Sequence, residues 1–148
     1  MERPVSIVWF ERCYLGALVL GVLNTALSWN TLMAQMAAQP NADKFGAGFG
    51  ATVMIISLAI GVGISLLLWF LAARKHSVVA KWIITVFFVL GVLGLLFQII
   101  GKTFPSGIAG VVTVVAWVLN LIAVYQLFKP DTEVWFGEKK PDQGGHVL

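Results

Sequence analysis

The stretch "GATVMIISLAIGVGISLLLWFLAA", residues 50–73, decides the fold, because it contains no charged residue. Its apolar residues follow one another without the strict alternation that is typical of a half-buried strand. A helix needs about 20 apolar residues to cross the ~30 Å hydrocarbon core of a bilayer, and this stretch is long enough. Because every backbone polar group in lipid must be paired internally, we predict a transmembrane helix.

Three further blocks of the chain have the same length and character, namely residues 7–28, 79–101 and 107–128. The short turns after residues 73 and 101 force antiparallel neighbours, and Pro40 is expected to end a helical extension of the first block. We therefore predict an all-α, integral membrane four-helix bundle. It forms a single transmembrane domain over residues 1–148, and residues 129–148 are expected to be a flexible cytoplasmic tail.

The composition agrees with a membrane protein, since 59% of the 148 residues are hydrophobic and only 11% are charged. Soluble domains average roughly 25% charged residues. The net charge of +3 is not accompanied by a basic face or a nucleic-acid motif, so no nucleic-acid partner is expected. The single cysteine, Cys13, excludes an intramolecular disulfide and a paired-cysteine motif. Neither zinc-ligand spacing nor a phosphate-binding loop is present, so we expect no cofactor.

The orientation is predicted from the cations near the helix ends, because cytoplasmic loops carry an excess of Lys and Arg. With the N-terminus inside, only Lys44 and Lys102 lie on the far side. The cytoplasmic side then holds Arg3, Arg12, Arg74, Lys75, Lys81, Lys129, Lys139 and Lys140. We therefore expect both termini to be cytoplasmic in the cell (inner) membrane. The expected topology and interface anchors are Arg12, Trp29, Arg74, Lys75 and Lys81.

The N-terminal block also has some features of a signal peptide, because Ala26, Leu27 and Ser28 provide the small residues of a cleavage site. However, the apolar run continues past Leu23 to Trp29, which is long enough to span the bilayer. We therefore expect the segment to be retained as the first span.

Small and polar residues recur at helical spacing in each span, as at Ser57, Gly61 and Ser65. Such stripes let helix backbones approach closely in lipid, so we expect close contacts at Gly61 and Gly94. Asn24, Gln98 and Asn120 are interpreted as interhelical hydrogen-bonding groups, each contributing about 1 kcal/mol or less, with Asn24 and Gln98 a direct pair. The alternative interpretation makes the three amides, together with Glu11, the lining of a polar path.

Glu11 and Arg12 stand side by side near the cytoplasmic end of the first span, where long side chains can reach the headgroups. We interpret Glu11 as an interfacial carboxylate that pairs with Arg74 or Lys81. The alternative is a carboxylate that binds a proton or a cationic ligand. In the tail, Val134, Trp135 and Phe136 lie among charges, as in an interfacial anchor or a docking motif.

In outline the chain resembles the many small four-span bacterial inner-membrane proteins that carry no assigned activity. Small multidrug exporters share the outline, but that family relies on a carboxylate well inside the first helix, whereas Glu11 lies near its edge. We expect a non-enzymatic accessory or interaction subunit, because no catalytic set is visible. The alternative is a small oligomeric transporter or channel for a small or cationic solute. The expected partners are the lipid bilayer and a protein partner or further copies of the chain.

Overall fold

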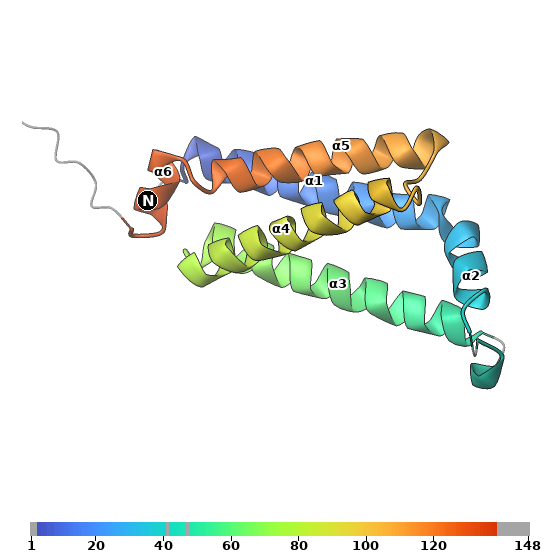
Figure 1. Cartoon of the computed structure of the whole chain (residues 1–148). Coiled ribbons are helices and arrows are strands. Elements are labelled where there is room, and N and C mark those ends of the chain that lie inside the picture. Colours follow the sequence, from blue (N-terminus) through green and yellow to red (C-terminus); the bar gives the residue numbers. More distant parts are fainter. Residues whose placement is uncertain (1–2, 41, 47, 139–148) are drawn as a thin grey trace, which may run out of the picture.

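The computed structural model describes residues 3–40, 42–46 and 48–138, in which all regular elements are helical (Figure 1). Four helices are long and apolar enough to cross a membrane: α1 (Val5–Leu27), α3 (Phe49–Arg74), α4 (Val78–Ile100) and α5 (Gly107–Gln126). They coincide with the four predicted spans, with ends that differ by two residues or fewer. The all-α, four-span prediction is confirmed, and the chain is a multi-pass membrane protein.

Three short elements join or follow the spans: α2 (Trp29–Ala37), the 3-10 helix η1 (Ala42–Phe45) and α6 (Pro130–Trp135). The first helix does not continue straight beyond the span. It is interrupted at Ser28 (φ −93°, ψ 6°), and α2 leaves α1 at an angle. α3 begins after Gly48, whose φ of 88° is favourable only for glycine.

The two ends of the molecule differ in charge. At one end, which we call the basic end, lie the start of α1, the α3–α4 turn and α6 (Figure 1). At the other, the loop end, lie α2, η1 and the α4–α5 turn, with Lys44 and Lys102. The described cations of the basic end are Arg3, Arg12, Arg74, Lys75, Lys81 and Lys129. The fold therefore groups the cations as the orientation prediction requires.

The four spans are not packed equally. α1 and α5 run side by side (Figure 1), with contacts near the middle, where a Cβ on Gly16 would lie 3.5 Å from Leu119, and toward the loop end. α3 and α4 meet at the basic end and diverge toward the loop end. α4 contacts α5 near the middle of both helices, where Trp117 lies against Phe88 and Gly91. The result is a pair, α1 and α5, against which α3 packs at the basic end, while α2 contacts α3 at the loop end.

The buried core lies at the basic end. The buried residues of α3 are Leu68, Ala72 and Ala73, all in its final turns, and those of α4 are confined to its first turns. The core cluster comprises Ile7, Phe10, Cys13, Leu68, Ala72, Ala73, Ala80, Ile84, Ala123, Leu127, Trp135 and Phe136. Most other apolar side chains of α3 and α4 are exposed on the chain and so are available to lipid.

The start of the tail differs from the flexible segment expected over residues 129–148. Residues 130–135 form α6, and Trp135 and Phe136 are buried in the core. The physical reason is that these two aromatic side chains bury their apolar surface against the chain's own helix ends. Residues 139–148 lie outside the described part of the chain.

Candidate functional site

A groove of about 360 Å³ separates α1 from α3 at the depth of the spans. The residues that line it are mostly small or hydroxyl-bearing. From α3 they include Ser57, Gly61 and Ser65, and from α1 Gly21 and Thr25. Asn120 of α5 lies on the same groove. Gly21, Ser57 and Gly61 are exposed, so the groove is open in the chain alone.

The four-residue spacing of Ser57, Gly61 and Ser65 places them on one face of α3, as the sequence predicted. Near the basic end this face meets α1, where the Ser65 side chain interacts with Tyr14. At Ser57 and Gly61, however, it is exposed and does not pack closely against a neighbouring helix of the chain. A Cβ built on Gly61 or on Gly94 would meet nothing within 4 Å, so the expectation that these two glycines lie in close contacts is wrong. The close contact is at Gly91, where a Cβ would lie 2.6 Å from the Trp117 ring.

The polar residues of the spans also pair differently from the prediction. The Asn24 Nδ2–H donates to Thr113 Oγ1 at 2.9 Å, because the neighbour of α1 is α5 and not α4. Gln98 is exposed near the loop end, so the proposed Asn24–Gln98 pair is absent. Asn120 donates to the carbonyl of Ala116 at 3.1 Å within its own helix.

Glu11 forms one of the two ion pairs predicted for it from the sequence. Its carboxylate lies 3.1 Å from Arg3 Nη1 and 3.6 Å from Arg74 Nε, and its side chain is 14% exposed. The predicted partner Arg74 is therefore found, whereas Lys81 is paired elsewhere. Glu11 lies at the basic end and Gln98 near the loop end, so Glu11, Asn24, Gln98 and Asn120 do not come together as one path.

Lys81 is the largest departure from the predicted anchors. It is only 3% exposed, and its Nζ lies 2.6 Å from Glu138 Oε2. The ammonium also lies 4.7 Å from the ring centre of Phe128 and 5.5 Å from that of Phe136. Such cation–π contacts stabilise a desolvated ammonium. Sequence reasoning missed this site because the partner carboxylate belongs to the tail.

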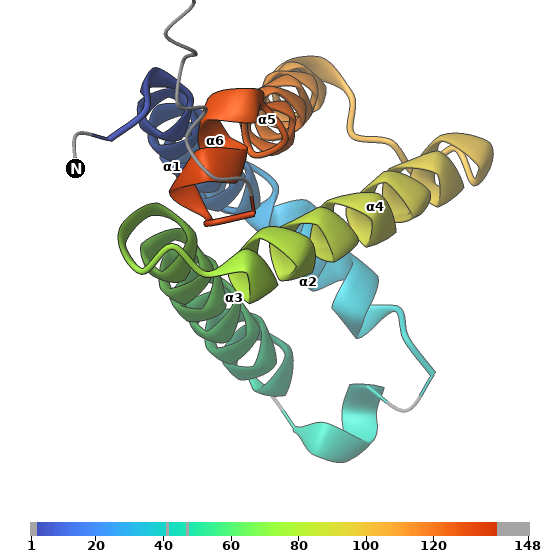
Figure 2. The ribbon, with the colours of Figure 1, turned by 90° about the vertical axis from the view of Figure 1, so that its left-hand side faces the viewer.

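Residues 130–138, which we call the clasp, form three further hydrogen bonds and one ring contact. Asp131 accepts hydrogen bonds from the Ser6 hydroxyl (2.9 Å) and from the Ser6 backbone N–H (3.4 Å), so it caps the start of α1. The Nδ1–H of His76 donates to the carbonyl of Trp135 at 2.8 Å, and the two rings are 3.8 Å apart. Figure 2 looks at this end and shows α6 among the ends of the long helices.

The remaining predicted anchors lie where a membrane interface would require them. Arg12 and Lys75 are exposed at the basic end, and the Arg74 guanidinium lies 6.0 Å from the Trp69 ring centre. Trp29 opens α2 at the loop end. Their contacts with headgroups stay a prediction.

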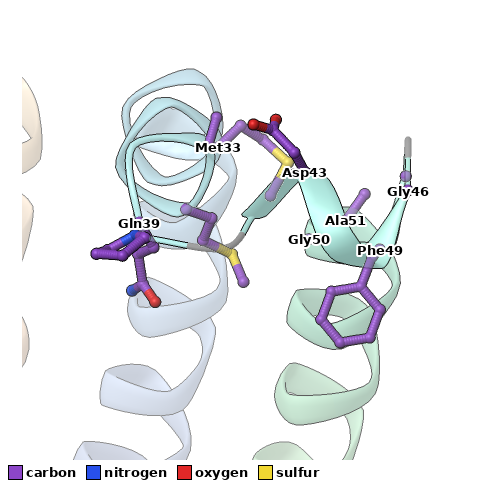
Figure 3. A pocket seen from close by; sticks show the side chains of 11 residues that line it. Met33, Gln39, Asp43, Gly46, Phe49, Gly50 and Ala51 are labelled. Atoms are coloured by element: carbon purple, nitrogen blue, oxygen red, sulfur yellow. The ribbon is translucent and has the colours of Figure 1, made fainter.

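A larger pocket, of about 520 Å³, lies between α2 and the start of α3 (Figure 3). Its lining is mainly apolar, with Met33, Met36 and Phe49, while Asp43 and Gln39 are its main polar side chains. Methionine makes such a pocket adaptable in shape. Its lining includes none of Glu11, Asn24, Gln98 and Asn120, whereas Asn120 lines the groove, so we base the functional argument on the groove.

Comparisons with known proteins give no match: no protein-family model, no curated protein and no solved structure is similar to this chain.

Proposed function

We propose that the chain is a non-enzymatic accessory or interaction subunit of the inner membrane that binds a transmembrane helix of another protein in the α1–α3 groove. The observation that carries the proposal is that Ser57 and Gly61 line the groove and are exposed on the chain alone. A stripe of this kind normally lies against a second helix.

The physical argument concerns what can fill the groove in a bilayer. Lipid tails are as apolar as leucine, so helices associate in lipid through close packing and interhelical hydrogen bonds. Gly21 and Gly61 leave space on both walls for a backbone to approach. An acyl chain could occupy that space, but it offers no hydrogen-bonding group to Ser57 or Asn120. A helix with its own small and polar residues offers both shape and partners.

The alternative of a small oligomeric transporter or channel receives less support. Its expected path residues do not lie together: Glu11 pairs with arginines at the basic end, and Gln98 is exposed near the loop end. Asn24 and Asn120 bond to different groups of α5. A homo-oligomer without transport remains compatible with the groove, since a second copy also supplies transmembrane helices. The identity of the retained partner distinguishes these cases.

The test compares two glycines on the same helix. Gly61→Leu fills the groove, whereas Gly63→Leu adds the same bulk outside the groove lining, and both positions have no neighbour within 4 Å. After purification in mild detergent, we expect a co-purifying protein to be lost from Gly61→Leu and retained with Gly63→Leu. Equal retention in both variants would overturn the proposal, and loss of a homodimer would identify a second copy as the partner.

The proposal includes an orientation with both termini in the cytoplasm, supported by the cations of the basic end. On a Cys13→Ser background, we expect the single variants Lys44→Cys and Lys102→Cys to react with a membrane-impermeant thiol reagent in intact cells. Lys75→Cys should react only after permeabilisation. Reaction of Lys75→Cys in intact cells would reverse the orientation.

A further inference from the structure

The clasp contacts α1, α4, the end of α5 and the turn that joins α3 to α4. It follows α5 in the chain, and Asp131 binds Ser6 at the start of α1. Trp135 stacks on His76 of the α3–α4 turn, and Glu138 pairs with Lys81 of α4. The Thr132 hydroxyl, which is fully buried, donates to the Gln126 carbonyl at 2.8 Å and fixes α6 against the end of α5. No other short element of the described chain joins so many helix ends.

The groove begins directly beyond this end of α3. Leu68, Ala72 and Ala73 are the buried residues of α3, and Ser65, the first groove residue, lies one turn before Leu68. From there α3 diverges from both α1 and α4 toward the loop end (Figure 1). The width of the groove therefore depends on the angle at which α3 leaves the core, and at the loop end also on the contact between Gly50 of α3 and Met36 of α2.

We propose that the clasp sets the angle between α3 and α1, and that docking or release of the clasp regulates entry of the partner helix into the groove. The regulation of partner binding rests on the function proposed above. The mechanical part of the inference does not, because it concerns the chain alone.

Because α3 is long, a small change in its tilt at the basic end moves its other end by several ångströms. A helix rises about 1.5 Å per residue, so Thr52 lies roughly 30 Å along α3 from Ala72. A tilt of about 10° at Ala72 would move Thr52 by roughly 5 Å at that length. Since an interhelical distance is typically 8–10 Å, a movement of this size decides whether another helix can enter.

Binding of a partner helix in the groove and docking of the clasp are thermodynamically linked, so each changes the equilibrium of the other. If the partner helix binds one width of the groove more tightly, its binding must shift the clasp toward the state that gives this width. A protein that binds the clasp from the cytoplasmic side would in turn change the affinity of the groove for its helix. The clasp is thus a route by which events at the membrane surface reach a site within the bilayer.

The experiment measures the distance between spin labels on Ala26→Cys of α1 and Thr52→Cys of α3, in purified full-length protein on a Cys13→Ser background. The test variant is Asp131→Asn with Glu138→Gln, which removes the charges of two clasp contacts and keeps the size of the side chains. The control is Lys102→Gln, which removes an exposed charge of the α4–α5 turn at the loop end, away from both labelled helices. We expect the distance distribution of the test variant to broaden or shift by roughly 5 Å, and that of the control to stay unchanged.

A second readout shows whether the clasp has been released. Thr132 is fully buried, so the thiol of a separate Thr132→Cys variant should react slowly with a maleimide while the clasp is docked. Loss of two charge-assisted contacts should raise its rate of labelling roughly tenfold or more. An unchanged rate would overturn the role of these contacts, and a raised rate with an unchanged 26–52 distance would overturn the control of α3 by the clasp.

These measurements use the chain without a partner, so they do not depend on the proposed function. If the distance changes but Gly61→Leu and Gly63→Leu retain the same proteins, the clasp controls α3 and the groove has another occupant. If the distance is constant while Gly61→Leu alone loses its partner, the docking site stands and its regulation by the clasp is refuted.

Discussion

The α1–α5 pair and helix α3 show how similar spans can have different surroundings. Both contain small residues at four-residue spacing, and neither carries a charge in the middle of the bilayer. In the pair, Cys13 and Ala17 are buried and Asn24 finds a partner on the neighbouring helix. On α3, the corresponding stripe remains open beside α1. A small-residue stripe therefore does not by itself predict a close neighbour within the same chain.

The largest expected loss of stability comes from a large-to-small substitution in the buried core at the basic end. Phe10 is fully buried in the core at the basic end, so Phe10→Ala should lower the free energy of unfolding by about 3–5 kcal/mol. Phe87→Ala is the matched change on α4, where the ring is exposed and faces lipid, and should cost far less. Denaturant unfolding of both variants in one detergent makes the comparison. Equal losses would show that the core does not lie where the structure places it.

The two carboxylates that form ion pairs at the basic end should also differ in how much they contribute to the free energy of unfolding, with the buried pair contributing more. Glu138→Gln leaves the buried Lys81 ammonium without its charged partner, which should cost about 1.5–3 kcal/mol. Glu11→Gln removes a carboxylate whose partners, Arg3 and Arg74, are exposed, and should cost about 0–1 kcal/mol. Unfolding at low and high salt measures both values. A larger effect at Glu11 would mean that this carboxylate, and not the clasp, holds the basic end together.

The smallest of the three effects concerns two glycines of α4. Gly91→Ala places a Cβ 2.6 Å from Trp117, and the resulting shift of the ring should cost about 1–3 kcal/mol. Gly94→Ala meets no neighbour and should be neutral or stabilising by up to about 1 kcal/mol through helix propensity. Thermal unfolding followed by tryptophan fluorescence suits this pair. A loss of stability in Gly94→Ala would show that a helix covers this face in the purified protein.

The spans were predictable from the sequence because hydropathy and length depend on each segment alone. Residues 50–73 lie within the observed Phe49–Arg74, and the pairing of Glu11 with Arg74 followed from their position near one membrane surface.

The lateral arrangement was not predictable, because every apolar face is compatible with lipid and hydropathy does not select a neighbour. The assumption that four stripes meet in one closed interface led to the wrong pair, Asn24 with Gln98, and to close contacts at Gly61 and Gly94. The burial of Lys81 depends on Glu138, which is distant in the sequence. The sequence signal for the clasp was the run of Val134, Trp135 and Phe136, which fits a lipid anchor or a partner as well as the chain's own core.

The open groove is the central claim, and photo-crosslinking in native membranes tests it most directly. A photoreactive residue in place of Ser57 would lie in the groove, and the same residue in place of Ile56 would lie at nearly the same depth outside the groove lining. We predict that position 57 yields a discrete crosslinked protein, either a partner or a second copy, and that position 56 reacts with lipid only. Crosslinking of position 57 to lipid alone, with the same yield as position 56, would contradict the account.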